Sequence, residues 1–154
     1  DYTNQKHGNV FSYFFSQNAI KRVYSNTLSI PVDPLPSSNK APAFIGTLTN
    51  LIAKIEPAHS RVGQGMLLTL TLSGQGDLES INMVALQNIP EGLAWYESQK
   101  TTQVDKAQPG HAIHRMEYIV QGLQPGDYTI PPQEIFYFDD IQRVYKTIKT
   151  TTLP

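Results

Sequence analysis

The stretch MLLTLTLS at residues 66–73 alternates two sets of side chains, and this alternation limits the fold more than any other feature. A period of two places successive side chains on opposite faces of a strand, whereas a helix needs a period near 3.6. We therefore predict a half-buried strand here. Its core-facing residues are expected to be Met66, Leu68, Leu70 and Leu72, and its other face carries Leu67, Thr69, Thr71 and Ser73.

Six further segments are rich in Thr, Tyr, Ile and Val, as strands prefer. They span residues 47–55, 92–98, 114–121, 127–130, 134–138 and 143–153. Clusters of glycine, proline and small polar residues separate them and predict turns. About seven short strands predict an all-β chain, specifically an immunoglobulin-like antiparallel β-sandwich. A small barrel is the structural alternative.

Two aromatic residues fit the sandwich. In LQPGDYTIP, Tyr128 follows a Pro-Gly turn and precedes Ile130 by two residues, the spacing of a tyrosine corner whose hydroxyl bonds to upstream backbone. Trp95, the one tryptophan, is expected to anchor the core rather than to stack on a ligand, because buried aromatic side chains dominate core energetics.

Charge and composition exclude several classes of protein. Twelve basic and 13 acidic residues leave a formal charge of −1, which gives no field to attract nucleic acid or anionic lipid. The chain has no cysteine, so disulfides and thiolate zinc sites are excluded. No stretch approaches the roughly 20 consecutive apolar residues of a membrane span. No basic-then-apolar leader follows Asp1, so we expect any signal peptide to be removed or to lie outside this sequence.

An internal repeat indicates how the chain is organised. The run Ile20–Tyr24 (IKRVY) matches Ile141–Tyr145 (IQRVY), each after an aromatic cluster, at an offset of 121 residues (145 minus 24). That offset equals about one sandwich domain plus a linker. We therefore predict that residues 1–32 are the C-terminal strands of a preceding sandwich, that 33–42 form a Pro/Ser-rich linker, and that 43–154 form the sandwich domain.

Asp139 and Asp140 are the most conspicuous candidate site, but their position predicts a turn. They stand where EIFYF must reverse into RVYKT, and aspartate favours turns because its side chain hydrogen-bonds nearby backbone. The matching place in the first repeat, residues 16–18, holds Ser-Gln-Asn, which are turn formers without carboxylates. A calcium site would need six or more oxygen ligands.

No other residues nominate a catalytic, cofactor or metal site. His111 and His114 are three residues apart, which places them on opposite faces of the predicted strand and argues against a shared metal. The sequence contains no GxSxG, HExxH or GxxxxGK[ST] motif. We therefore predict no catalytic residue, no cofactor-binding residue, no metal ligand and no enzyme activity.

An ordered set of motifs resembles the BatD family of bacterial oxygen-tolerance or aerotolerance proteins. The motifs are VGQGMLLTLTLSGQGDLESI, GDYTIPPQEIFYFDD and VYKTIKT. The resemblance covers residues 43–154, and SNTLSIPVDPLP resembles the strand and linker before this domain in the family. One departure is Asp140, where the family often has proline.

The resemblance implies a function in protein association. Members carry a signal peptide, tandem immunoglobulin-like domains outside the cytoplasmic membrane and a membrane helix, which implies a periplasmic or otherwise extracytoplasmic, membrane-anchored protein. It also implies partners: BatA- and BatB-like membrane proteins with von Willebrand A domains, and a MoxR-type ATPase system. We thus expect an interaction or scaffold module that itself contacts no nucleic acid and no membrane, with self-association through the N-terminal strands as a further possibility. A glycan- or ligand-binding module that uses surface aromatics is the alternative.

Overall fold

The computed structural model describes residues 22–82, 84–106 and 108–153. The chain divides into two units, residues 1–37 and 38–154. In the first unit, residues 22–37 contain no helix or strand and their side chains are exposed. The predicted strands within 1–32 lie mostly outside the described residues. Their assignment to a preceding sandwich, and that of 33–42 to a linker, stay predictions.

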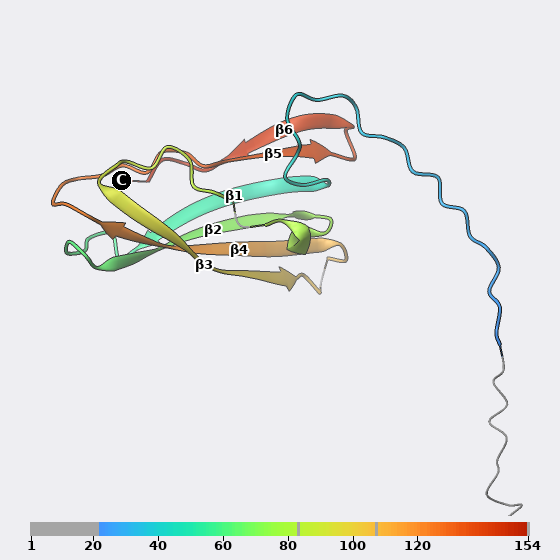
Figure 1. Ribbon diagram of the computed structural model, residues 1–154, viewed down its shortest axis with the longest axis horizontal. Coiled ribbons are helices and arrows are strands. Elements are labelled where there is room, and N and C mark those ends of the chain that lie inside the picture. The colour runs from blue at the N-terminus through green and yellow to red at the C-terminus, as the bar shows by residue number, and fades with distance from the viewer. Residues whose placement is uncertain (1–21, 83, 107, 154) are drawn as a thin grey trace, which may run out of the picture. The chain divides into compact units, whose positions relative to one another are not determined.

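The second unit is a sandwich of two antiparallel sheets, as predicted (Figure 1). The larger sheet contains β1 (Thr47–Glu56), β2 (Gly65–Gln75), β3 (Leu93–Val104) and β4 (His111–Gly122), in the order β1-β2-β4-β3. The smaller sheet pairs β5 (Glu134–Asp139) with β6 (Val144–Lys149) and lies over one face of the larger sheet. Neither sheet closes on itself, so the fold is a sandwich and not the alternative barrel.

The strand order matches that of an immunoglobulin constant domain. In such a domain strands A, B, E and D form one sheet and C, F and G form the other. Here β1, β2, β4 and β3 take the places of A, B, E and D, and β5 and β6 take the places of F and G. The described residues between 81 and 92, where strand C would lie, form no strand.

Side-chain hydrogen bonds, rather than the backbone ladder of a strand, hold this irregular segment. The amide nitrogen of Gln87 donates to Oε1 of Gln133 at 2.7 Å, and Nε2 of Gln133 donates to the carbonyl oxygen of Gln87 at 3.1 Å. Gln133 is 2% exposed, so these bonds satisfy a buried amide. Before this segment, the short 3₁₀ helix η2 (Leu78–Ser80) buries Leu78 against the core.

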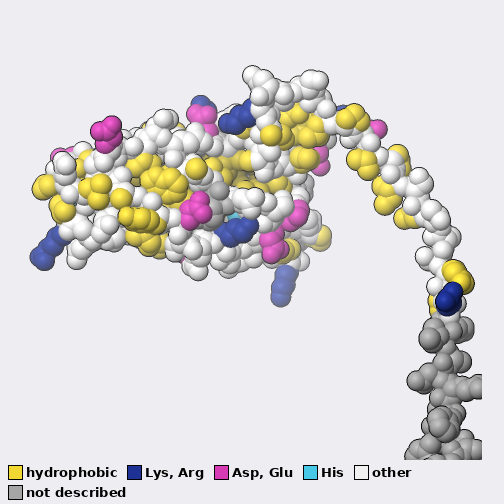
Figure 2. Space-filling view, viewed as in Figure 1, with side chains coloured by type: hydrophobic (Ala, Val, Ile, Leu, Met, Phe, Trp, Pro, Cys, Tyr) yellow, Lys and Arg dark blue, Asp and Glu magenta, His cyan; other side chains and the backbone are white. Residues whose placement is uncertain are grey.

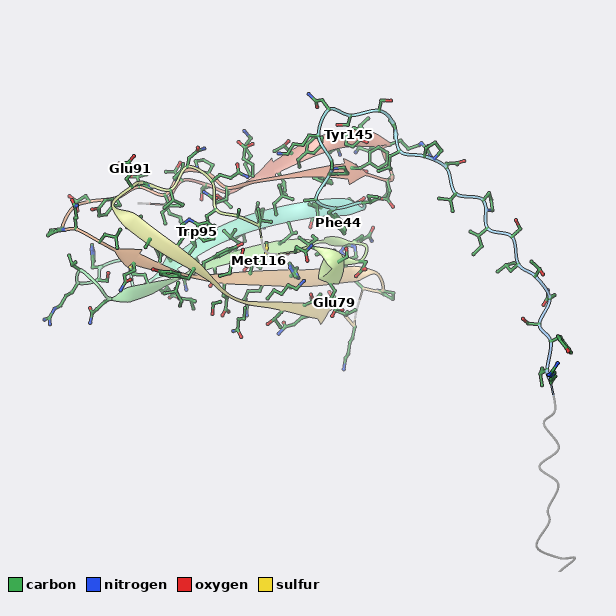
Figure 3. All side chains as sticks on the ribbon, in the orientation of Figure 1. Phe44, Glu79, Glu91, Trp95, Met116 and Tyr145 are labelled. Atoms are coloured by element: carbon green, nitrogen blue, oxygen red, sulfur yellow. The ribbon has the colours of Figure 1, made fainter. Side chains whose placement is uncertain are left out.

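The core forms where the alternating residues of β2 face inward. Leu68, Leu70 and Leu72 are at most 1% exposed, which confirms the predicted register, and Met66 is partly buried at its margin. Across the ladder they pair with Tyr118, Met116 and His114 of β4. Met116 and Phe44, both labelled in Figure 3, belong to this buried core.

Residues 43–46 join the sheets by running beside β5 before β1 begins. The amide nitrogens of Ala43 and Gly46 donate to the carbonyl oxygens of Phe136 at 2.8 Å and Phe138 at 3.0 Å. Gly46 has φ +146°, and a Cβ there would overlap the ring of Phe44. Glycine is therefore required where the chain passes from one sheet to the other.

One predicted strand is wrong. Residues 127–130 form only an isolated bridge, in which Ile130 pairs with Leu153. Pro131 and Pro132 follow directly, and proline has no N–H to continue a ladder. The segment predicted as a strand at 143–153 likewise ends early, because β6 stops at Lys149.

Charged side chains of both signs are interspersed over the surface shown in Figure 2, in keeping with the small net charge. Among residues 22–82, 84–106 and 108–153, no helix is long and apolar enough to span a bilayer.

Candidate functional site

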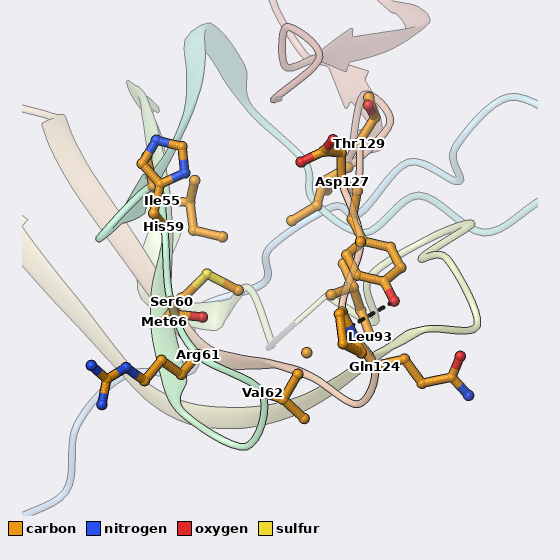
Figure 4. A pocket seen from close by; sticks show the side chains of 16 residues that line it. Ile55, His59, Ser60, Arg61, Val62, Met66, Leu93, Gln124, Asp127 and Thr129 are labelled. Carbon is orange, nitrogen blue, oxygen red and sulfur yellow. Dashed lines mark hydrogen bonds between the residues drawn. The ribbon is translucent and has the colours of Figure 1, made fainter.

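An open groove of about 610 Å³ lies at the end of the sandwich where the β1–β2 loop faces the β4–β5 connection. Figure 4 shows His59 and Arg61 on the side of the β1–β2 loop and Asp127 and Thr129 on the opposite side. The deeper lining is apolar and comes from Ile55, Met66, Leu93, Tyr128 and Ile130. The groove therefore combines an apolar interior with a polar rim.

The predicted tyrosine corner builds one wall of this groove. The hydroxyl of Tyr128 donates to the carbonyl oxygen of Gln124 at 3.1 Å, four residues upstream, which confirms the prediction. The ring of Tyr128 lies against Gly92, and a Cβ at Gly92 would overlap it. The amide of Leu123 also donates to the carbonyl of Gly92 at 2.9 Å. Glycine at position 92 thus allows the β4–β5 connection to pack closely.

Backbone and amide hydrogen bonds hold the opposite wall. Gly63 donates its N–H to the carbonyl oxygen of Gly122 at 3.0 Å, and the side-chain amide of Gln121 donates to the carbonyl of Gly63. Gln64 donates its N–H to the carbonyl oxygen of Arg61 at 2.9 Å and accepts from the N–H of Arg61 at 3.2 Å. Hydrogen bonds therefore fix the β1–β2 loop to the end of β4, and the β4–β5 connection to Gly92 and within itself, before any ligand binds.

The groove has the form of a binding site. Its ionisable rim groups, His59, Arg61 and Asp127, are all exposed and come from separate parts of the two walls. An apolar interior beside a few polar groups is the usual form of a pre-formed binding site. In the part of the chain that the structure describes, no group of three His, Cys, Asp or Glu side chains is placed to hold a metal ion.

Asp139 is the last residue of β5, and Asp140 begins the turn to β6. This turn lies at the opposite end of the strands from the β1–β2 loop and the β4–β5 connection (Figure 1). Oδ1 of Asp139 accepts from the amide nitrogen of Gln142 at 2.8 Å, which is the predicted turn chemistry. Oδ2 accepts from the Lys146 ammonium at 2.6 Å. The hydrogen bond from Lys146, and next that from the Gln142 amide, lower the pKa of Asp139. Asp140 is exposed and accepts from Oγ1 of Thr47 at 3.4 Å.

The two histidines of β4 face opposite ways, as predicted. His111 contacts the side chain of Gln75 at 2.6 Å between Nε2 atoms, toward the outer face. His114 is fully buried, with Nδ1 2.8 Å from Oγ1 of Thr102, and its Nε2 has no hydrogen-bond partner among the residues that the structure describes. Burial, and next the charge of Lys100, lower the pKa of His114.

Within 22–82, 84–106 and 108–153, the aromatic side chains do not form a single exposed platform. Trp95 packs on the core, with its ring 6.1 Å from that of Tyr118 in an edge arrangement, as expected for an anchor (Figure 3). Tyr118 is fully buried, and its hydroxyl donates to the carbonyl oxygen of Val84 at 2.7 Å. In the smaller sheet, the ring of Tyr145 stacks on that of Phe136, with 5.4 Å between the ring centroids. A glycan platform needs several aromatics aligned on one solvent-facing surface, so this arrangement gives the glycan alternative little support.

Sequence reasoning predicted neither wall as part of a groove. The spacing of the tyrosine corner predicted the hydrogen bond that holds the β4–β5 connection, although the strand predicted at 127–130 is wrong. The β1–β2 loop, PAHSRVGQ at 57–64, carries no motif typical of a binding site. Its partner strands β1 and β2 are visible from their alternation. The groove forms only because the fold brings the loop that joins β1 and β2 opposite the β4–β5 connection.

Comparison with known proteins gives one match. The family model described as the BatD DUF11-like domain matches residues 53–154, about two thirds of the chain. The matched region includes both walls of the groove and all the strands except the first part of β1. No curated protein and no solved structure matches the chain.

Proposed function

The chain belongs to the BatD family, and on that basis we propose that residues 38–154 act as a non-enzymatic protein-interaction domain in an extracytoplasmic, membrane-anchored protein of the aerotolerance type. The groove at the end of the sandwich is its binding site. The observation that supports this function most is the apolar interior of a groove whose walls are already fixed by hydrogen bonds.

The shape of the groove favours a protruding segment of a protein as ligand. Its apolar interior can take one or two apolar side chains, while Arg61 and Asp127 on opposite rims can each pair with a charge or a backbone group. Because the walls need not reorder, binding loses little conformational entropy. A pre-formed pocket with a polar rim is the usual arrangement at the centre of a protein interface.

The proposed partners follow from the family. They are BatA- and BatB-like membrane proteins with von Willebrand A domains, which act with a MoxR-type ATPase system. In this proposal a loop of the partner enters the groove, and the membrane anchor of the BatD-like protein keeps both proteins at the same surface. Effective concentration at the membrane then compensates for a small contact area.

Co-purification from native membranes tests the function. The full-length protein is compared with a form that lacks residues 38–154 and with Val62→Asp, which places a charge at the mouth of the groove, where Val62 is 52% exposed. Thr147→Asp on the exposed side of β6 is the matched control. We expect a von Willebrand A protein to co-purify with the wild type and the control only. Equal recovery with all four proteins would refute the proposal.

A further inference from the structure

The outer face of β4 carries an ordered set of four side chains. The inward residues of this strand are buried. The middle of its outward row consists of Ile113, Arg115, Glu117 and Ile119, with His111 and Gln121 at the two ends. Ile113 is 41% exposed and Ile119 is 37% exposed, which is unusual for isoleucine on an inner strand of a sheet. The outer face therefore presents apolar, positive, negative and apolar side chains in that order.

This order is complementary to itself. Consider a two-fold axis that lies in the plane of the face, perpendicular to β4, and passes between Arg115 and Glu117. The axis brings each Arg115 opposite Glu117 of a second copy, and each Ile113 opposite the second Ile119. A two-fold contact uses the same patch on both copies, so a patch must match its own reversed image, as this one does.

The neighbouring strands leave these four side chains accessible. Register places Thr69 and Thr71 of β2 on one side of Glu117 and Arg115, and Gln99 and Thr101 of β3 on the other. Threonine is shorter than arginine or glutamate, so Arg115 and Glu117 are not screened on that side. Ile113 and Ile119 lie beside Ser73 and Leu67 of β2 and keep 41% and 37% of their surface exposed. Because β4 lies between β2 and β3, its residues also lie near the centre of any face-to-face contact.

Arg115 and Glu117 are both able to bind a charged group of another molecule. The guanidinium of Arg115 forms no hydrogen bond or ion pair with the described residues, whereas Nε2 of Gln99 donates to Oε2 of Glu117 at 2.7 Å and holds that carboxylate in place. An oriented carboxylate is a good acceptor for a guanidinium, which can bind it with two parallel N–H groups.

We propose that the outer face of the four-stranded sheet binds the same face of a second copy, with Arg115 of each copy paired to Glu117 of the other. Only one orientation satisfies the charges, because an axis parallel to β4 would bring each Arg115 onto the other. This contact is separate from the groove and does not depend on its function.

The area of the outer face determines how tightly the two copies are expected to bind. Four strands about 4.8 Å apart and about ten residues long cover roughly 600 Å². A stable interface buries about 800 Å² on each partner. The dimer should therefore be weak, with a dissociation constant in the micromolar range or above. Anchoring both copies to one membrane would favour it.

Charge exchange tests the proposal. Sedimentation equilibrium of the full chain is measured over a concentration series for the wild type, Arg115→Glu, Glu117→Arg and the double variant with both exchanges. Arg143→Glu, an exposed residue of the β5–β6 turn, is the control for the change in charge. Near-ultraviolet circular dichroism checks that each variant is folded. Both substituted side chains point away from the core, so folding should be retained.

We expect a concentration-dependent dimer in the wild type and in Arg143→Glu. Each single exchange at 115 or 117 should raise the dissociation constant at least tenfold, and the double variant should return to within a few-fold of the wild type, because the exchanged charges again match. A wild type that stays monomeric throughout, a dimer insensitive to the single exchanges, or a double variant as weak as the singles would each overturn the inference. A wild type that stays monomeric would mean that some other molecule covers this face.

Discussion

The Lys146 ammonium lies 2.6 Å from Oδ2 of Asp139, and the side chain of Asp139 is 2% exposed. Oδ1 of the same carboxylate accepts the N–H of Gln142 at 2.8 Å. One aspartate therefore closes the β5–β6 turn and also pairs with a charge on the returning strand. Its neighbour Asp140 is exposed and accepts one long hydrogen bond, from Oγ1 of Thr47 at 3.4 Å.

This relationship predicts a stability difference that depends on pH. Because the folded pKa of Asp139 is lowered, its contribution is present above the unfolded pKa near 3.8 and is lost as the pH falls through the folded pKa. Asp139→Asn should lower the melting temperature at pH 7, and the gap to the wild type should narrow as the pH falls below about 4. Asp140→Asn is the matched control and should melt close to the wild type.

A second outcome of these substitutions concerns metal. If Asp139 and Asp140 only shape a turn, calorimetric titration with calcium should give no saturable heat in the wild type or in the double Asn variant. A saturable signal that disappears in the double variant would show that the pair is a site.

His114 predicts a loss of stability in mild acid. Its folded pKa is lowered by burial, so its neutral form is favoured in the folded state. Stability is then complete above the unfolded pKa near 6.5 and falls as the pH decreases toward the folded pKa. His114→Leu combined with Thr102→Val, which leaves no buried hydroxyl unpaired, should flatten the melting temperature between pH 7 and 5. His59→Gln, an exposed control, should keep the wild-type slope; equal slopes in all three proteins would contradict this account.

Leu70 tests the register of the core. It is 1% exposed and pairs across the ladder with Met116. Leu70→Ala should lower the free energy of unfolding by about 2 to 5 kcal/mol, the usual range for truncation of a buried leucine. Thr71→Ala, one residue along on the outer face, should change it far less. Denaturant melts measure both, and a loss below about 0.5 kcal/mol for Leu70→Ala would show that this side chain is not in the core.

The alternating pattern predicted the strands well because burial on one face enforces a period of two. It could not reveal that side-chain hydrogen bonds of Gln133 hold the segment where strand C would lie, since a lone glutamine between Pro132 and Glu134 has no distinctive pattern. Local spacing predicted the tyrosine-corner hydrogen bond of Tyr128, which the structure places in one wall of the groove. The opposite wall, and the match of Ile113 with Ile119 across the face of β4, depend on which strands are neighbours.

Residues 22–32 make a prediction about association. Leu28, Ile30 and Val32 alternate along the sequence and are 79%, 72% and 87% exposed. We expect this segment to pair with the same segment of another copy, because an apolar, alternating segment whose backbone is unpaired readily recruits a second strand. Light scattering should show more association for the full chain than for one that starts at Ala41. If both are monomeric and the segment is protected from hydrogen exchange in the longer chain, intramolecular pairing is correct instead.

Site-specific photocrosslinking in native membranes tests the central claim, that the groove binds a partner protein. A photoreactive amino acid replaces Val62 at the mouth of the groove in the full-length protein, and Thr147 on the exposed side of β6 serves as the control position. The account predicts a crosslink from position 62 to a membrane protein with a von Willebrand A domain, and none from position 147. A crosslink to that protein from position 147 and not from position 62 would contradict it.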